Sequence, residues 1–339
     1  MTGADGFVGR HLVQALIADG AAVRALDVRF GRAFPDRVET IAGDILDEER
    51  IRAVMAGIDT VFHLAAVTDL WAPPKDPGQH YRINAGGTQT VLDAATEAGV
   101  RRFVYCSSNV ALIGSGAAPE EIDESFRPSR DALFGAYARS KRDAEEIVAA
   151  AGDRIETIVA MPGTPIGPGD HRPTPPGRLL RDLANGLVPA LPRRALVNLV
   201  DVEHLAGALA RTRYRGVPGS KYLLTGCDVS FGRLAETMAE ITGLSMPREI
   251  VPRSVALAAA VGEDLVWSTL TGRAPTASFD GVRMAVRMRR FSNAKARRDL
   301  DLAPTDLHQS VARAVDWMAQ RGMIERALPG IEAPTGVRG

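Results

Sequence analysis

The sequence has little cysteine, no excess of charge of either sign and no long apolar run. Its 339 residues include two cysteines, Cys106 and Cys227, and 41 basic against 41 acidic side chains. Two cysteines cannot build a disulfide framework, which favours a reducing, cytoplasmic location. Neither has a Cys or His neighbour at metal-binding spacing, so we expect no metal site.

The balanced charge provides no field that would attract nucleic acid or an acidic membrane surface. No apolar stretch reaches the length of about 18 residues that a membrane helix needs. The N-terminus lacks the basic start of a signal peptide. We therefore expect neither a nucleic-acid partner nor a membrane partner.

Glycine is concentrated at the start of the chain, where Gly3, Gly6 and Gly9 precede a helical pattern. Glycine lets the backbone turn sharply and lets a pyrophosphate approach, and the helix N-terminus attracts the phosphates. An apolar run over 22–27 ends in Asp27, about 20 residues after the glycines, where a ribose 2′-hydroxyl would be held. These features predict a dinucleotide-binding turn.

Only Met1 and Thr2 precede Gly3, although a dinucleotide fold has a buried strand before its first glycine. We expect the natural start to lie upstream of Met1, so that the first strand is truncated in this sequence. An in-frame stop codon just before Met1, with no earlier start codon, would contradict this expectation.

Short apolar runs alternate with longer helical patterns over the first 160 residues. Strands are expected at 22–27, 38–41, 59–65, 102–107 and 156–160, and helices at 9–19, 47–56, 80–98 and 135–151. This alternation predicts an α/β fold of the Rossmann type, a doubly wound parallel sheet with helices on both faces.

The pattern changes at 162–177, where six prolines and four glycines predict a long loop. Strands are expected beyond it at 195–200 and 221–225, and helices at 202–212, 231–242, 254–272 and 305–321. We therefore expect a dinucleotide-binding domain over 1–161 with contributions from 195–212. A smaller α/β substrate lobe over 162–327 and a loose tail over 328–339 complete the chain.

Tyr137 and Lys141 lie four residues apart at the start of a helical pattern, so they share a face of that helix. A nearby ammonium favours the phenolate and would lower the pKa of the tyrosine. A tyrosine tuned in this way can transfer a proton to or from a substrate oxygen. The same spacing also occurs in ordinary surface pairs.

Several polar residues follow or interrupt the expected strands and helices. Ser107 and Ser108 end a strand and could hydrogen-bond the substrate oxygen or cap a turn. Asn84, inside the helix expected at 80–98, could be a polar kink or a water site. Asp44 could face an adenine edge or cap the helix that begins near Asp47.

His63 and two tryptophans are weaker candidates. A histidine at a strand end is more often a buried, hydrogen-bonded residue than a catalyst, and the small Ala65 and Ala66 beside it leave room for a cofactor. Trp71 could line a pocket. Trp267 is expected in the core or in a lid.

Together these motifs resemble the extended short-chain dehydrogenase/reductase superfamily. The matching segments are Thr2–Gly9, Gly43–Ile45, His63–Ala66, Asn84 with Gly87 and Thr88, Ser107–Ser108, Tyr137 with Lys141, Pro162–Gly163 and Gly167–Asp170. Within it, the segments 70–73, 270–273 and 291–296 look like dihydroflavonol reductases and 3β-hydroxysteroid dehydrogenases, especially the hopanoid-associated sequences.

The resemblance implies a nicotinamide cofactor and assigns roles. Tyr137 would be the general acid/base, Lys141 would hold the nicotinamide ribose, and Ser108 would orient the substrate oxygen. Asp27 favours NAD over NADP because it would repel a 2′-phosphate, although Arg29 keeps NADP as a minority alternative. The implied cofactor-binding residues are Gly3, Asp5, Gly6, Phe7, Val8, Asp27, Asp44, Ile45, Leu64, Ala65, Ala66, Asn84, Tyr137, Lys141, Pro162, Gly163 and Thr164.

The sequence departs from the superfamily pattern at two points. Five residues separate Ser108 from Gly114, one more than in sugar-nucleotide members, so Ser108 is aligned from its strand. Met161 stands where an arginine often precedes the Pro-Gly pair, which bears on how the floor of the active site is anchored.

The expected function is that of an NAD-dependent oxidoreductase that interconverts a secondary alcohol and a ketone on a small or medium, partly apolar substrate. An alternative is a nucleotide-sugar epimerase or dehydratase with tightly bound NAD, for which Arg193, Arg194, Arg283, Arg287 and Arg289 could bind the diphosphate. The intact Tyr137 and Lys141 argue against a non-catalytic dinucleotide-binding regulator. By analogy with relatives, we expect a homodimer through the helices at 80–98 and 135–151.

Overall fold

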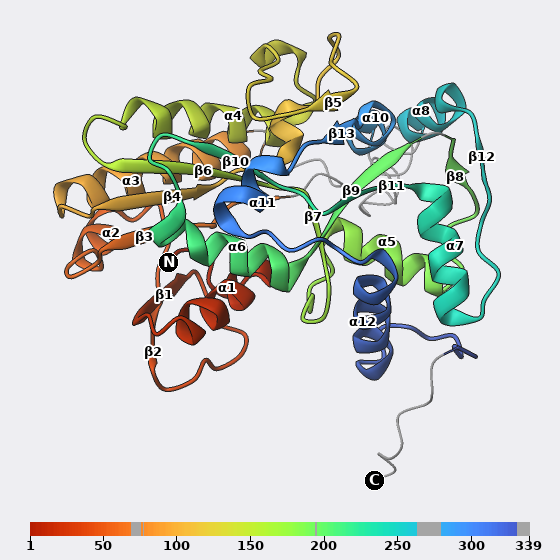
Figure 1. Cartoon of the computed structure of the whole chain (residues 1–339), viewed down its shortest axis with the longest axis horizontal. Helices are drawn as coiled ribbons and strands as arrows, with labels where there is room; N and C mark the ends of the chain where they lie inside the picture. The colour runs from red at the N-terminus through yellow and green to blue at the C-terminus, as the bar shows by residue number, and fades with distance from the viewer. Residues whose placement is uncertain (69–75, 77, 194, 263–278, 331–339) are drawn as a thin grey trace.

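The computed structural model describes residues 1–68, 76, 78–193, 195–262 and 279–330 (Figure 1). Its larger part is a parallel sheet. Along this sheet the strands are β2 (Val38–Ala42), β1 (Val23–Asp27), Thr2, β3 (Thr60–His63), β4 (Arg102–Cys106), β6 (Glu156–Pro162) and β10 (Lys221–Leu224). Thr2 forms parallel bridges with both Leu26 and His63. The short segment before Gly3 therefore occupies the centre of the sheet.

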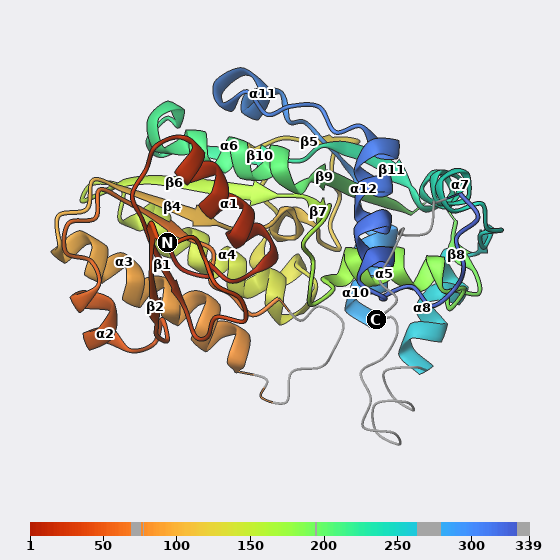
Figure 2. The same cartoon turned by 90° about the horizontal axis from the view of Figure 1, so that it is seen from below.

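Helices cover both faces of this sheet (Figure 2). The helices α1 (Phe7–Ala18), α6 (Val202–Arg215) and α11 (Ala294–Leu300) pack together on one face, and α2 (Glu48–Ala53), α3 (Gly87–Glu97) and α4 (Gly135–Ala150) lie on the other. In β4, Phe103 and Tyr105 belong to the core under α3 and α4, whereas Val104 belongs to the core under α1 and α6. The apolar strands are thus buried on both sides, which confirms the predicted doubly wound sheet.

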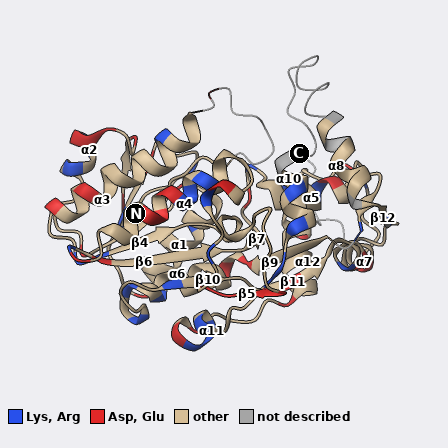
Figure 3. Cartoon of the chain, turned by 90° about the horizontal axis from the view of Figure 1, so that it is seen from above, with Lys and Arg blue, Asp and Glu red and all other residues tan. Residues whose placement is uncertain are grey.

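The smaller part surrounds a second sheet of order β11 (Cys227–Ser230), β9 (Leu196–Asp201) and β7 (Thr164–Ile166). It includes α5 (Pro175–Ala184), α7 (Phe231–Thr242) and α12 (Leu307–Gln320), which pack on one another, and α8 (Arg253–Gly262) beside α10 (Phe279–Arg287). Two short pairs complete it, β12 (Glu249–Val251) with β8 (Leu191–Pro192) and β13 (Arg290–Phe291) with β5 (Glu121–Ile122). Figure 3 shows basic and acidic residues interspersed along the helices.

The structure differs from the sequence predictions in several elements. The helix expected at 80–98 begins as a π-helical turn, η1 (Tyr81–Gly86), before α3. The loop expected at 162–177 contains β7 and the start of α5, because proline fits the first turn of a helix and Thr174 caps it. Strand β11 and helix α5 were not expected. The helix expected over 254–272 is described only as far as Gly262.

Short 3₁₀ turns, η2 (Asn109–Leu112) and η3 (Arg130–Ala132), connect β4 to α4. Most of the tail expected over 328–339 lies outside the described residues. Within the part of the chain that the structure describes, no helix combines the length and the apolar character needed to span a membrane.

Candidate active site

The predicted site residues follow the carboxyl ends of neighbouring strands. Because the strands are parallel, the turns that follow them leave the sheet at one edge, which is where open α/β sheets bind ligands. In spatial order these are Asp44 after β2, Asp27 at the end of β1, Gly3 after Thr2, Leu64 after β3, Ser107 after β4 and Pro162 at the end of β6. The strand order therefore gathers residues that are up to 159 positions apart in sequence.

The three glycines of the first turn have different physical roles. Gly3 has a φ of +68°, and a Cβ there would lie 2.6 Å from Ala65 N. A Cβ on Gly9 would lie 2.1 Å from Gly3 O. A Cβ on Gly6 would meet only Gly3 O, at 3.3 Å. Gly3 and Gly9 are thus needed for the protein's own packing, whereas Gly6 keeps open space in front of the turn.

Helix α1 begins at this open space. Its N-cap is Gly6, which provides no capping side chain, and its first turn has no acidic residue. The first amides of the helix, at Phe7 and Val8, can therefore donate to an anion, and the helix dipole favours one there. The residues present fit the pyrophosphate of a dinucleotide.

Asp27 and Asp5 shape the turn from the side of β1. The Asp27 carboxylate accepts from the amides of Asp5 (2.9 Å) and Val28 (2.8 Å), and burial raises its pKa. The Asp5 carboxylate accepts from Arg10 Nε (2.8 Å) and from the Gly31 amide (2.8 Å). The Asp5 side chain thus builds the turn, and Asp27 remains the acid at the ribose position.

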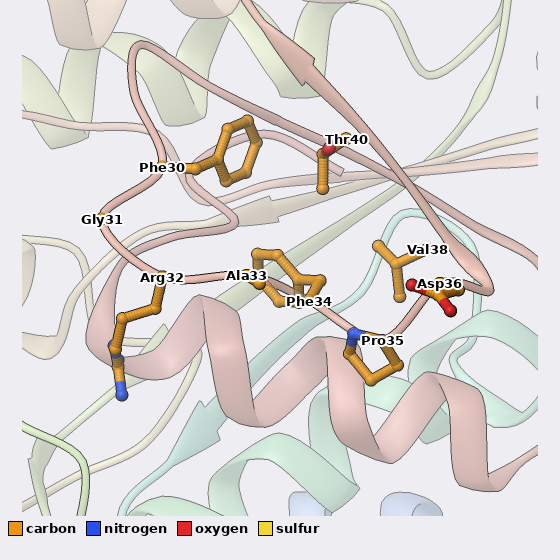
Figure 4. Close-up of a pocket in the computed structure, with 9 residues that line it drawn as sticks. All are labelled: Phe30, Gly31, Arg32, Ala33, Phe34, Pro35, Asp36, Val38 and Thr40. Atoms are coloured by element: carbon orange, nitrogen blue, oxygen red, sulfur yellow. The ribbon is translucent and has the colours of Figure 1, made fainter.

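A hollow of about 550 Å³ lies beside this turn, lined by the segment that follows Asp27 (Figure 4). Its lining residues are Phe30, Gly31, Arg32, Ala33, Phe34, Pro35, Asp36, Val38 and Thr40. The Arg10 guanidinium lies 4.2 Å from the centre of the Phe34 ring and fixes this segment to α1. None of the predicted site residues lines the hollow.

The structure decides some of the alternatives for Asp44 and Asn84: Asp44 does not cap α2, its place at an adenine edge stays a prediction, and Asn84 lies in the π-helical turn η1, in keeping with a polar kink. Asp44 is exposed and accepts from the Leu46 amide (3.0 Å), while Asp47 is the residue that caps α2. Both Nδ2 hydrogens of Asn84 are used, to Val67 O (3.0 Å) and to Ser140 Oγ (3.0 Å). Asn84 therefore ties the loop after β3 to α4, and its contact with a cofactor stays a prediction.

The remaining cofactor candidates differ in exposure. Ile45 is buried and packs against Gly87. Leu64, Ala65 and Ala66 are half-buried at the end of β3, as expected for residues that face a ligand.

The residues after β6 pack tightly. Met161 is fully buried, and a Cβ on Gly163 would lie 2.7 Å from Asn198 O. Gly163 thus permits close packing of β6 on β9, between Pro162 and Thr164. Met161, which stands where an arginine is common in the superfamily, is therefore an apolar core residue.

Tyr137 and Ser108 meet at the end of β4. Tyr137 is buried on α4, and the Ser108 side chain lies near its phenol. Burial raises the pKa of Tyr137, and the nearby Ser108 hydroxyl opposes that rise only in part. The expectation that Lys141 lowers this pKa is therefore wrong for the chain by itself, because desolvation of the phenolate dominates.

Lys141 lies one helical turn beyond Tyr137. Its Nζ donates to Cys106 O at 2.8 Å and lies 5.0 Å from the centre of the Tyr105 ring. Burial lowers the pKa of Lys141 to about 8, against the raising effects of Cys106 and Glu145. The ammonium is thus held at the strand end that precedes Ser108. The Cys106 side chain is half-buried.

Ser107 and Ser108 point to different partners although they are adjacent. Ser107 is buried and donates to Glu145 Oε1 at 2.5 Å, two helical turns beyond Tyr137 on α4. The role of Ser108 in orienting the substrate oxygen stays a prediction, and its side chain lies near the Tyr137 phenol. Glu145 was missed, although its position four residues after Lys141 could have indicated it.

One neighbour of Tyr137 was also missed. The ring of His80, a buried residue just before η1, lies edge-on to the Tyr137 ring with centroids 6.2 Å apart. Arg283, one of the arginines predicted as diphosphate ligands, has its guanidinium 4.2 Å from the centre of the ring of Phe134, the residue that precedes α4. This contact brings α10 of the smaller part to the start of α4.

His63 is the buried, hydrogen-bonded residue that the sequence favoured. Thr88 Oγ1 donates to Asn84 O, so it accepts from His63 Nε2 (3.0 Å), and Nδ1 accepts from Thr2 Oγ1 (2.8 Å). Burial and the nearby Lys141 lower the pKa of His63 to about 3. The imidazole is therefore neutral and structural.

Trp71, Trp267 and the segments 70–73 and 270–273 lie outside the described residues. The segment 291–296 is described, and within it Asn293 Nδ2 donates to Thr225 O at 2.6 Å, after β10.

Comparison with known proteins gives relatives along almost the whole chain. The model of the NAD dependent epimerase/dehydratase family matches residues 1–201. A Synechocystis protein, provisionally named dihydroflavonol 4-reductase, is 35% identical over 335 residues, which are 96% of this chain and 95% of the relative. Sterol demethylase protein B of Methylococcus capsulatus is 31% identical over 336 residues, 96% of this chain and 99% of its own.

Solved structures agree with this similarity. The crystal structure of Gox2253 superposes with a TM-score of 0.80 at 30% identity and covers 95% of this chain and 98% of its own. MoeE5 in complex with UDP-glucuronic acid and NAD superposes with a TM-score of 0.74 at 26% identity, covering 94% of this chain and 98% of its own.

Proposed function

The chain belongs to the NAD dependent epimerase/dehydratase family and is an NAD-dependent enzyme, and from this premise we propose that it interconverts a secondary alcohol and a ketone. The observation that carries the proposal is the placement of the buried Tyr137 near Ser108 at the end of β4, with the Lys141 ammonium one helical turn away and donating to Cys106 O at 2.8 Å. The reductase and sterol-modifying names of the relatives favour a partly apolar small-molecule substrate.

Each residue has a distinct role in this proposal. When bound, NAD supplies hydride transfer at its nicotinamide ring. Tyr137 gives its phenolic proton to the substrate oxygen in reduction and takes it back in oxidation, and Ser108 orients both oxygens through its hydroxyl. Lys141 holds the nicotinamide ribose through its ammonium. Asp27 holds the adenosine ribose and excludes a 2′-phosphate by repulsion.

The test is turnover of NAD or NADH with a panel of ketones and secondary alcohols, followed by absorbance at 340 nm. Tyr137→Phe removes the transferable proton and leaves the ring, so kcat is expected to fall by about 10²–10⁴-fold with NAD binding unchanged. Tyr214→Phe, at an exposed tyrosine on α6, serves as the control and keeps full activity. Undiminished turnover in Tyr137→Phe would contradict the assignment of the acid/base.

A nucleotide-sugar epimerase or dehydratase is the second candidate. The similarity to MoeE5 and the position of Arg283 against Phe134, the residue that precedes α4, support it. Such an enzyme would purify with bound NAD and would convert a UDP-sugar without net change at 340 nm. Net consumption of added NADH with a ketone would favour the oxidoreductase instead.

The proposal includes a homodimer that acts in the cytoplasm. Helices α3 and α4 pack side by side, and residues such as Asp93 and Ile147 are only half-buried on them. Both cysteines are free thiols, in keeping with a reducing compartment. Light scattering coupled to gel filtration tests the dimer, and the mass of a single chain would contradict it.

A further inference from the structure

Lysine is rare in this protein. Of its 41 basic side chains only four are lysines, namely Lys75, Lys141, Lys221 and Lys295. Two of these four, Lys141 on α4 and Lys221 on β10, lie near one buried carboxylate, that of Glu145. A lysine ammonium is a compact charge whose pKa shifts readily on burial, whereas an arginine stays charged. The protonation of these two lysines can therefore depend on their surroundings, including the Glu145 carboxylate.

The Glu145 carboxylate is held at both oxygens. Ser107 Oγ donates to Oε1 at 2.5 Å, and Lys221 Nζ donates to Oε2 at 2.5 Å. The Glu145 side chain is 1% exposed and that of Lys221 23% exposed. Glu145 thus joins α4 to β10 and to the end of β4, at the residue that lies between Cys106 and Ser108.

Lys141 and Tyr137 depend on the same strand end. Lys141 donates to Cys106 O, and the Tyr137 phenol lies near Ser108, so the residues on both sides of Ser107 adjoin the proposed machinery. Tyr137, Lys141 and Glu145 are spaced by four residues and follow one face of α4. A shift of Ser107 would therefore move the contacts of both functional side chains.

The charge of Glu145 also acts on Lys141. Titratable and charged groups face Lys141 or Glu145 from α4, β3, β4 and β10: Tyr137, Arg142, His63, Tyr105, Cys106 and Lys221. Among these described groups, only Glu145 carries a carboxylate. Burial favours the neutral amine of Lys141, and the negative charge of Glu145 opposes this effect.

We propose that Glu145 is a positioning residue for the Tyr137–Lys141 site, which keeps Lys141 an ammonium and fixes the strand end 106–108, with Lys221 as its counter-ion. The inference rests on the proposed function. The inference extends the proposed function by two residues, Glu145 and Lys221, which touch neither the substrate nor the cofactor in that function.

The direct test is the titration of Lys141 in protein labelled with [ε-¹³C]lysine, which gives one ¹³Cε resonance for each of four lysines. Lys141→Arg identifies the Lys141 resonance. In Glu145→Gln, which keeps the shape of the side chain, the midpoint of Lys141 is expected to move to lower pH by about one unit. Glu146→Gln is the matched control, because the neighbouring Glu146 is exposed and pairs with Arg127.

Lys221→Gln gives a prediction of opposite sign. Without its counter-ion, the Glu145 carboxylate acts on Lys141 alone while keeping its bond from Ser107, so the midpoint of Lys141 is expected to rise. If the two substitutions acted only through a loss of packing, the midpoint of Lys141 would shift in the same direction in both variants or in neither. An unchanged midpoint in Glu145→Gln, or a fall in Lys221→Gln, would overturn the proposal, and Lys221→Gln decides it if Glu145→Gln does not fold.

Turnover separates this inference from the proposed function. The ammonium is needed for activity, so kcat is expected to fall as the pH rises through the midpoint of Lys141, and this limb should move to lower pH in Glu145→Gln. If the midpoint shifts but wild-type protein has no turnover, the proposed function fails. If turnover is present and the midpoint does not shift, the role of Glu145 fails and the proposed function stands.

Discussion

The buried His63 links the stability of the sheet to the pH of the solution. His63 is enclosed at the sheet centre, with its two ring nitrogens bonded to Thr2 and Thr88. The bond that Nδ1 accepts from Thr2 needs the neutral imidazole, and burial penalises the charged form, so the folded pKa of about 3 lies far below the value of 6.5 in an unfolded chain.

Acid is therefore expected to destabilise the fold through His63. Between pH 6.5 and 3 the unfolded chain binds a proton at His63 that the folded chain does not. Stability from this residue is present above pH 6.5 and declines as the pH falls, by about 1.4 kcal/mol per pH unit. Urea unfolding at several pH values measures this slope, which should be smaller in His63→Asn and unchanged in His308→Asn. Equal slopes in all three proteins would contradict the assignment.

At the next scale, α1 and the turn before it show how one motif serves both packing and binding. Gly9 faces the backbone of Gly3 and Ala4 at distances a Cβ could not tolerate, while a Cβ on Gly6 would meet only Gly3 O, at 3.3 Å. Both are glycine in a G-x-x-G-x-x-G spacing, so the sequence pattern alone cannot separate the two roles.

Two alanine substitutions separate them experimentally. Gly9→Ala places a Cβ 2.1 Å from Gly3 O and 2.9 Å from Ala4 O. It is expected to lower the free energy of unfolding by about 1–3 kcal/mol through overpacking. Gly6→Ala should cost less than about 1 kcal/mol but weaken NAD binding about tenfold or more, because its methyl group occupies the phosphate approach. Thermal unfolding and calorimetric NAD titration measure the two effects, and the reverse ranking would refute these roles.

Across the whole molecule, Asp201 connects the two parts. It ends β9, caps α6 through the Glu203 amide, and accepts from Ser310 and Arg313 of α12. Its side chain is 1% exposed, and the bonds from Arg313 and Ser310 hold its pKa below the usual range despite burial. The helix that covers the first sheet and a helix of the smaller part thus share one buried charge.

Removing the cation should weaken this connection. Arg313→Ala leaves the Asp201 carboxylate without its charged partner, so we expect a loss of about 1–3 kcal/mol of unfolding free energy. Glu203→Gln removes the exposed partner of the same arginine and should cost less than about 0.5 kcal/mol. Chemical denaturation of both variants is the measurement, and similar losses in the two would show that the buried carboxylate is not the anchor.

The sequence alone determined the features that depend on near neighbours. Alternating apolar runs and helical patterns predicted the doubly wound sheet, glycine spacing predicted the turn before α1, and a spacing of four placed Tyr137 and Lys141 on one face. These follow from the periods of strands and helices and from local backbone freedom, so a short window of sequence contains them.

The tertiary structure decided what depends on strand order and burial. It set Ser107 toward Glu145 and Ser108 toward Tyr137, and it brought Lys221 to Glu145 across 76 positions of sequence. It also raised the pKa of Tyr137, where spacing had predicted a lower one. Contacts between distant segments and the desolvation of a buried group have no local period, so only the assembled fold determines them.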